Sequence, residues 1–294
     1  MARGDHIYVV RKAGYSHHGI DYGDGTVIHF SGEPGAAKRD ACITRASLDD
    51  FLKGGRLKVR EYGLRDDPDT TIARAESELG STNYHLISNN CEHFATWCCT
   101  GKKASAQVRG ATSLTTHGVV TGTSAAATVP LVATAGAVAG VSGPGIMTGL
   151  ASAGGLIGGG AAAGPTAIAL IPTAASLGIV TRTLRDDETL TDGERASRRA
   201  GRTAAKVAAP TSLVAGGVTL WAAGTTGVSA VGISTGLATV GGVVGGGMMA
   251  GTVILASAPA VVVAGAGAGV YFAARFLLGR RRSKQCEVDG PNDV

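Results

Sequence analysis

The chain has 294 residues, of which 46 are glycine, 44% are apolar and only 4% are aromatic. Charge is unevenly distributed: residues 1–110 carry 15 Lys/Arg and 14 Asp/Glu, whereas residues 110–181 and 207–274 carry none. Such apolar, uncharged segments argue against disorder. The net charge of +5 comes mostly from 182–206 and 280–284, and no basic face with interleaved aromatics accompanies it. The composition therefore argues against a nucleic-acid partner and fits membrane-flanking segments better.

The cysteines indicate a reducing environment. Five cysteines, two of them adjacent (Cys98 and Cys99), do not make a disulfide framework. No secretory signal opens the chain, because Met1–His6 runs directly into a strand-like segment. We therefore expect residues 1–110 to face the cytoplasm.

The first expected elements form a β-hairpin. Residues 7–10, 17–22 and 26–30 are rich in β-branched and aromatic residues, and Gly23-Asp24-Gly25 is a tight-turn signal between the second and third strands. His17 and His29 lie on these neighbouring strands at similar distances from the turn. We expect both imidazole rings to share one face of the sheet, and His18 to lie on the opposite face.

Further short elements complete a small domain. Several strands and a few helices within about 110 residues predict an α+β fold. The remaining expected elements are a short strand at Ile43, a helix capped by Ser47, a strand over 57–62, a helix over 68–80 and an extended segment over 84–87.

Cys91 is expected in the first turn of a helix. Asn89 or Asn90 is a good N-cap, Glu92 is placed to reach back as in a capping box, and Gly101 marks the C-terminal end. The positive end of the helix dipole favours a thiolate at Cys91. The alternative is that Cys91 is a small buried residue without chemistry, which is the usual fate of a free cysteine.

His17, His29 and Cys91 together suggest thiol chemistry. A cysteine nucleophile needs an imidazole that moves protons and a third polar group that fixes the imidazole. Either histidine alone is as well explained as a half-buried strand residue. No Cys or His pair has zinc-ligand spacing, and the vicinal Cys98 and Cys99 cannot easily bind one tetrahedral ion, so we expect no metal and no cofactor.

Two motifs resemble a known family. His17–His29 reads HHGIDYGDGTVIH and Asn90–Phe94 reads NCEHF. Together they resemble the lecithin retinol acyltransferase domain family over about residues 3–110, which implies a circularly permuted papain-like domain. By position, the resemblance implies Cys91 as nucleophile, His17 as general base and His29 as the third polar group. Asp21-Tyr22 replaces the Tyr and aliphatic residue of many relatives, away from these three positions.

The glycine-rich remainder contains an internal repeat. Residues 140–174 align without gaps on 227–261, and 18 of the 35 pairs are identical. Each uncharged block of about 70 residues is long enough for two membrane spans of ~20 residues, which predicts two helical hairpins. The basic flanks at 102–109, 182–206 and 275–284 would then lie on the cytoplasmic side. A soluble Ala/Gly-rich helical bundle is the alternative.

The predicted organisation has five parts. Small-xxx-small pairs such as Gly154/Gly158 and Gly241/Gly245 suit close helix packing and a homo-oligomer. Cys286, after the basic tail, is a weak candidate for lipidation. The parts are a catalytic domain at 1–110, a first apolar repeat at 111–181, a charged linker helix at 182–206, a second apolar repeat at 207–279 and a tail at 280–294.

Three functional hypotheses follow. The family resemblance and the apolar repeat favour a membrane-anchored thiol acyltransferase or phospholipase that takes an acyl chain from a glycerophospholipid through a Cys91 thioester. The first alternative is a papain-like Cys/His amidase or peptidase, which does not need the apolar region. The second is a membrane-shaping protein whose small domain is regulatory.

Overall fold

The computed structural model describes residues 1–11, 15–31, 41–85, 89–224 and 229–288. They form two compact units: residues 1–112 with 186–195, and residues 113–185 with 196–294. The first unit therefore takes ten residues from the predicted linker. Residues 86–87 of the segment expected at 84–87 and residues 289–294 of the predicted tail lie outside the described residues, as does the side chain of Cys286.

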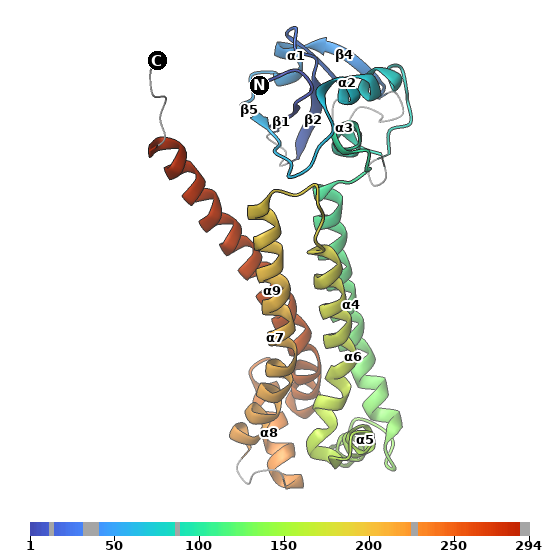
Figure 1. The fold of residues 1–294 in the computed structure, drawn as a ribbon. Helices are drawn as coiled ribbons and strands as arrows, with labels where there is room; N and C mark the ends of the chain where they lie inside the picture. The colour runs from blue at the N-terminus through green and yellow to red at the C-terminus, as the bar shows by residue number, and fades with distance from the viewer. Residues whose placement is uncertain (12–14, 32–40, 86–88, 225–228, 289–294) are drawn as a thin grey trace. The chain divides into compact units, whose positions relative to one another are not determined.

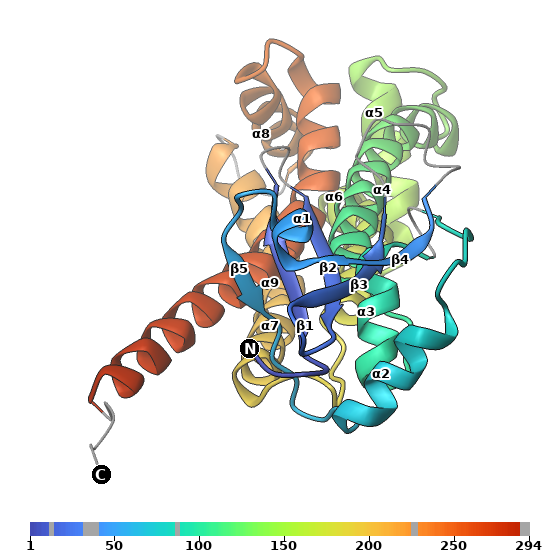
Figure 2. The same cartoon turned by 90° about the horizontal axis from the view of Figure 1, so that it is seen from above.

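The first unit is built on a five-stranded antiparallel sheet of order β4-β3-β2-β1-β5 (Figures 1 and 2). It confirms the expected α+β class. The strands are β1 (His6–Val10), β2 (Ser16–Asp21), β3 (Thr26–Phe30), β4 (Ile43–Ser47) and β5 (Leu57–Val59). The helices are α1 (Leu48–Leu52), α2 (Pro68–Ser77) and α3 (Cys91–Thr100).

Local signals explain most of these boundaries. Ser47 caps α1 as expected, and Gly101 ends α3 in the left-handed conformation with φ 68°. Gly23 and Gly25 both have positive φ in the hairpin turn. The strand expected over 57–62 ends at Val59, and the side chains of Arg60 and Tyr62 beyond it turn toward the interior.

The two faces of the sheet carry different cores. One face packs a cluster of Ile7, Val9 and Val27 against Phe51 of α1. The other packs Ile20, Ile28, Phe30 and Ile43 against α2 and α3, including Cys91 and Phe94. Side chains alternate between the faces along each strand. As a result, His17 and His29 share the face of α1, whereas His18 lies on the face of α3.

The second unit is helical. Figure 1 shows the short helices α5 and α8 at the same end of this unit. The long helices are α4 (Ala106–Ala135), α6 (Gly160–Thr183), α7 (Asp192–Ala223) and α9 (Gly247–Val288), and the short ones are α5 (Gly143–Gly155) and α8 (Ala230–Gly242). Within the described residues, three segments are long and apolar enough to cross a membrane: Thr115–Ala135, Gly160–Thr183 and Gly247–Leu278.

The first apolar block contains two of these segments, in agreement with the predicted two spans per block, whereas the second block contains one. Each block contains one short helix of 13 residues, too short to cross a bilayer at 1.5 Å per residue. The predicted linker helix at 182–206 is also divided, because α6 ends at Thr183 and α7 begins at Asp192. α7 then continues without a break into the second apolar block.

The two segments aligned in sequence have matched geometry. Ser142 and Ser229 cap α5 and α8, each accepting a hydrogen bond from the N–H three residues on. Gly158 and Gly245 have φ of 79° and 74°. A Cβ on Gly154 or Gly241 would lie 1.7 or 1.8 Å from the carbonyl oxygen six residues later. Several predicted small-xxx-small glycines are therefore used for helix packing inside this chain.

Candidate active site

Cys91 is the first residue of α3, as the sequence predicts. The Oδ1 atom of Asn90 accepts hydrogen bonds from the backbone N–H groups of Glu92 and His93, both at 3.0 Å. The capping box is completed by His93, whose Nδ1 lies 3.4 Å from the Asn90 backbone nitrogen. The expectation that Glu92 fills this role is wrong. The cap nevertheless fixes the helix start, and with it the backbone at Cys91.

Glu92 is instead buried in an ion pair. Its side chain is 2% exposed and accepts hydrogen bonds at 2.5 Å from Arg60 Nη1 and from Ser105 Oγ. A buried carboxylate needs such partners, because an unpaired one would be costly to desolvate. Glu92 therefore connects the first turn of α3 to Arg60, just beyond β5, and to the segment leading into α4.

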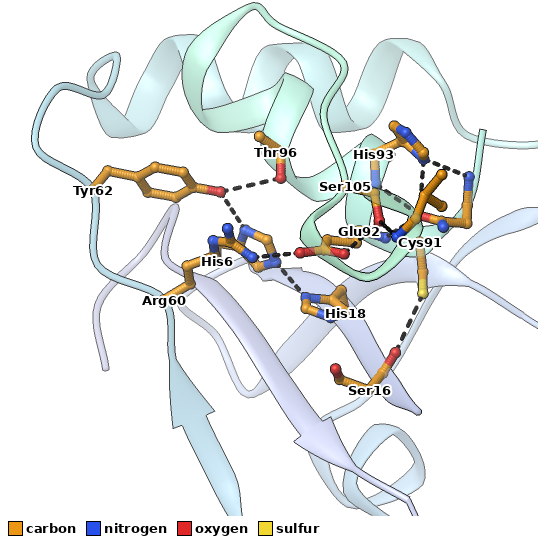
Figure 3. Close-up of polar contacts among 12 residues, drawn as sticks. His6, Ser16, His18, Arg60, Tyr62, Cys91, Glu92, His93, Thr96 and Ser105 are labelled. Atoms are coloured by element: carbon orange, nitrogen blue, oxygen red, sulfur yellow. Dashed lines mark hydrogen bonds and ion pairs between the residues drawn. The ribbon is translucent and has the colours of Figure 1, made fainter. Parts of the chain in front are cut away.

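The Cys91 thiol contacts the backbone of β2. Its Sγ atom lies 3.8 Å from the Ser16 carbonyl oxygen, to which the thiol donates, and Figure 3 shows it pointing to that residue. The backbone N–H of His18 also faces the sulfur. Residues Gly19–Asp21 of β2 pair with β3. The Cys91 sulfur contacts the part of β2 that precedes these residues. The sulfur thus touches the backbone on both sides of His17.

Burial raises the pKa of the Cys91 thiol to about 11. The Glu92 carboxylate acts in the same direction, while the backbone N–H groups of His18, Glu92 and Cys91 oppose it. The expected thiolate at the helix N-terminus is therefore wrong for this resting state, because desolvation outweighs the dipole. A nucleophilic Cys91 requires a base that removes the proton during the reaction.

His17 and His29 are held together as predicted. His17 Nε2 lies 3.0 Å from His29 Nδ1, and both rings pack on Phe51. His29 is paired with Gly19, so the two histidines are diagonal neighbours across the strands. A Cβ on Gly19 would lie 2.6 Å from Val27 Cγ1 and 3.1 Å from His29 Cβ. The glycine therefore provides the space in which the two rings meet.

Burial keeps both imidazoles neutral. It lowers the pKa of His17 to about 3, with further contributions from His29 and Arg11. Burial also lowers the pKa of His29, although the Phe30 carbonyl opposes this. His29 Nδ1 lies 2.8 Å from that carbonyl oxygen, which can only accept. In this arrangement His29 Nδ1 carries the proton, and His17 Nε2 is an acceptor.

A second histidine pair lies on the face of α3. His6 Nε2 is 2.8 Å from His18 Nδ1, and His6 Nδ1 is 2.6 Å from the Tyr62 hydroxyl (Figure 3). His6 is fully buried and His18 is 2% exposed. The Tyr62 hydroxyl also reaches Thr96 of α3 at 3.4 Å. This pair is not among the site residues predicted from the sequence, although strand alternation places both residues on one face.

The structure thus brings His17 and His29 together on the α1 face of the sheet, and it places Cys91 on the α3 face, against the β2 backbone next to His17. Among the described residues, a hydrogen bond between Cys91 Sγ and the His17 ring is not present. The described residues also contain no group of three or more His, Cys, Asp or Glu side chains placed to hold a metal ion.

Comparison with known proteins identifies the first unit. A family model described as "Lecithin retinol acyltransferase" matches residues 1–104. Human "Phospholipase A and acyltransferase 2" is 35% identical over 137 residues, which cover 41% of this chain and 83% of that protein. The chain belongs to the lecithin retinol acyltransferase family. Human "Phospholipase A and acyltransferase 4" is 34% identical, over 37% of this chain and 75% of that protein.

The family model matches the N-terminal part of the chain. Rat "Lecithin retinol acyltransferase" is 30% identical over 134 residues, which cover 36% of this chain and 57% of that protein. The chain therefore spans little more than half the length of this relative. Residues 1–104, which the family model matches, include β1 to β5, α1 to α3 and all three predicted site residues. They end before α4 begins at Ala106.

Proposed function

We propose that the protein is a membrane-anchored thiol acyltransferase or phospholipase A that acts on glycerophospholipids. Membership of the family supports the acyl-transfer class. The three long apolar helices support association with a bilayer. The observation that carries the residue assignment is the position of Cys91 at the capped start of α3, against β2, the strand that bears His17, whose ring contacts His29 of β3. Anchoring would keep the site where its lipid substrate is concentrated.

The first half-reaction forms a thioester. His17 takes the thiol proton, and the Cys91 sulfur attacks the ester carbonyl carbon of the phospholipid, forming a C–S bond and an oxyanion. Backbone N–H groups of His18 and Glu92 near the sulfur are candidate donors to that oxyanion. The C–O bond to glycerol then breaks, and His17 returns the proton to the glycerol oxygen. The products are the acyl-enzyme and a lysophospholipid.

The second half-reaction releases the acyl chain. Water, an alcohol, an amine or a lysolipid loses a proton to His17 and attacks the thioester carbonyl. The C–S bond breaks, and His17 protonates the leaving sulfur. The role proposed for His29 is to hold and polarise His17. For His17 Nδ1 to accept the Cys91 proton, the neutral His17 ring must carry its own proton on Nε2 and donate it to His29 Nδ1. His29 must then be the tautomer with its proton on Nε2, which gives up the Nδ1 hydrogen bond to the Phe30 carbonyl.

The membrane region and its orientation belong to the same proposal. We place the first unit on the cytoplasmic side, because Lys102, Lys103 and the basic residues of 182–206 flank the apolar helices. The matched geometry of 140–174 and 227–261 supports an origin by duplication. The permuted papain-like relationship and the five-part organisation, with its catalytic domain at 1–110, remain predictions, as does a homo-oligomer.

Product analysis tests the proposal. The full-length protein is incubated with phosphatidylcholine vesicles, with and without an amine acceptor, and the lipid products are measured by mass spectrometry. We expect lysophosphatidylcholine together with a free fatty acid or an acylated amine, and loss of these products in Cys91→Ser and His17→Ala. Undiminished turnover in both variants would sink the assignment. Cleavage of peptides without lipid turnover would favour the amidase alternative.

A further inference from the structure

The turn between α6 and α7 belongs to the first compact unit. The carbonyl oxygen of Thr189 accepts a hydrogen bond from the backbone N–H of Gly63 at 2.9 Å. Asp187 lies 3.6 Å from Lys102 Nζ, beyond the end of α3. A turn that the sequence places between two apolar blocks is therefore bound to the segment that follows β5.

The turn is shaped to present that carbonyl. Asp187 Oδ1 accepts hydrogen bonds from the backbone N–H and the hydroxyl of Thr189, both at 3.0 Å. The N–H of Leu190 returns to the Asp187 carbonyl at 3.1 Å. These contacts fix the peptide whose oxygen faces Gly63. They also lower the pKa of the Asp187 carboxyl, although its partial burial acts the other way.

Gly63 is the position that admits the turn. A Cβ built on Gly63 would lie 2.1 Å from the Leu190 carbonyl oxygen and 3.1 Å from that of Glu188. Both obstructing atoms are backbone, so rotation of a side chain cannot relieve the overlap. Any other residue at position 63 would push the turn away.

Gly63 directly follows the residues that reach the site. Arg60 holds the buried Glu92 carboxylate beside Cys91, and the Tyr62 hydroxyl holds His6, which in turn holds His18 (Figure 3). The segment from Arg60 to Gly63 contains no regular secondary structure. The Arg60 N–H holds one end of it on the His6 carbonyl at 2.8 Å, and the Gly63 N–H holds the other end on Thr189. The hydrogen bond between Gly63 and Thr189 is thus one residue from Tyr62 and three residues from Arg60 in the chain.

We propose that Asp187 and Thr189 are positioning residues, which dock the α6–α7 turn on Gly63 and so hold Arg60 and Tyr62 in the network beside Cys91. The inference rests on the proposed function for its effect on activity. Because the turn is continuous with both α6 and α7, insertion of these helices in a bilayer would fix its ends. Docking of the turn on Gly63 would then hold Arg60 and Tyr62 in place most firmly when the protein is embedded in a membrane.

The test uses the full-length protein in phosphatidylcholine nanodiscs. Asp187→Ala removes the side chain that shapes the turn and contacts Lys102, while residues 1–112 keep their sequence, and Gly63→Ala blocks docking from the other side. Gly193→Ala is the control, because a Cβ there meets nothing within 4 Å and the residue lies in the same unit. Hydrogen exchange is measured at the amides of Gly63 and Glu92, and the rate of Cys91 acylation is measured by intact mass.

We expect faster exchange at Gly63 and Glu92 in both variants and a roughly five- to tenfold lower acylation rate, as for about one lost hydrogen bond. KM should be unchanged, and Gly193→Ala should behave as wild type. Unchanged exchange at Gly63 in Asp187→Ala would overturn the docking, and faster Gly63 exchange with unchanged exchange at Glu92 would overturn the positioning role. If wild-type protein forms no acyl-enzyme, the proposed function fails, while exchange at Glu92 still decides the inference.

Discussion

At the scale of single residues, the site depends on desolvation. Burial raises the pKa of Cys91 and lowers the pKa of His17, so thiol and imidazole are both neutral at neutral pH. Proton transfer between them creates two charges in a buried site, which the backbone N–H groups at Cys91 and the His29 ring would stabilise. The chemistry therefore depends on small shifts in the position of Cys91 relative to β2.

Gly19 is the residue whose substitution tests this packing most simply. In Gly19→Ala the new Cβ would overlap Val27 Cγ1 and crowd His29. We expect a loss of stability of about 1–3 kcal/mol from overpacking and a lower rate of Cys91 acylation, because the His17–His29 contact is displaced. Thermal unfolding and intact mass provide the two measurements. A variant with wild-type stability and rate would show that the histidine pair tolerates displacement.

The buried histidines also predict a pH dependence. The pKa of His18 is lowered to about 4, mainly by burial and also by Arg60, whereas the unfolded value is about 6.5. Below pH 6.5 the unfolded state binds protons that the folded state does not. Stability therefore falls as pH decreases from about 6.5 to 4, and is insensitive to this group above 6.5.

Hydrogen exchange at the β1 and β2 amides measures this effect in the first unit. We expect protection to decrease from pH 7 to pH 5 after correction for the intrinsic exchange rate. His18→Phe retains an aromatic ring against Tyr8 and removes the ionisable group. The slope should become shallower in that variant. An equal slope in both proteins would assign the dependence to other groups.

At the scale of elements, the sequence predicts the hairpin and the start of α3 well, because their signals are local. The Gly-Asp-Gly turn sets the register that brings His17 and His29 together, and Asn90 and Gly101 delimit α3. The roles of Glu92 and Tyr62 could not be predicted, because their partners are 32 and 56 residues away in sequence. The His6–His18 pair has the same separation of 12 residues as His17–His29 and could have been found from strand alternation. The division of each apolar block into unequal helices depends on glycine turns that composition alone does not place.

The short helices provide a prediction at this scale. In Gly154→Leu the side chain would meet the Gly160 carbonyl, whereas in Gly155→Leu a Cβ meets nothing within 4 Å. We expect Gly154→Leu to separate α5 from α6 and to lower the unfolding midpoint in detergent, and Gly155→Leu to leave it close to wild type. The repeat offers a second matched pair, Gly241→Leu and Gly242→Leu. Equal effects within a pair would contradict the packing described.

At the scale of the whole molecule, the ends of the two short helices carry exposed apolar side chains. Leu156 is 88% exposed and Val243 is 86% exposed, in turns whose backbone N–H groups bond back to α5 and α8. Such an end is compatible with hydrocarbon, because its polar backbone is satisfied internally. The α6–α7 turn is charged, unlike the apolar ends of α5 and α8. We therefore expect the turn to lie in water and these ends to lie in the bilayer.

Cysteine labelling tests this topology. In sealed vesicles, and with Cys42 and Cys286 replaced, Glu188→Cys should react with a membrane-impermeant maleimide from the cytoplasmic side. Leu156→Cys should react only after detergent is added. The three cysteines of α3 are buried and contribute little background. Labelling of Leu156→Cys from either aqueous side would contradict the placement of this end in the bilayer.

The central claim is that Cys91 carries the acyl chain. Full-length protein in phosphatidylcholine vesicles is quenched with acid during turnover, digested and mapped by mass spectrometry. We expect one acyl group on the peptide that contains Cys91, loss of the adduct in Cys91→Ser, and no adduct on Cys98 or Cys99. Lipid turnover without an adduct at Cys91, or an adduct that persists elsewhere in Cys91→Ser, would contradict it.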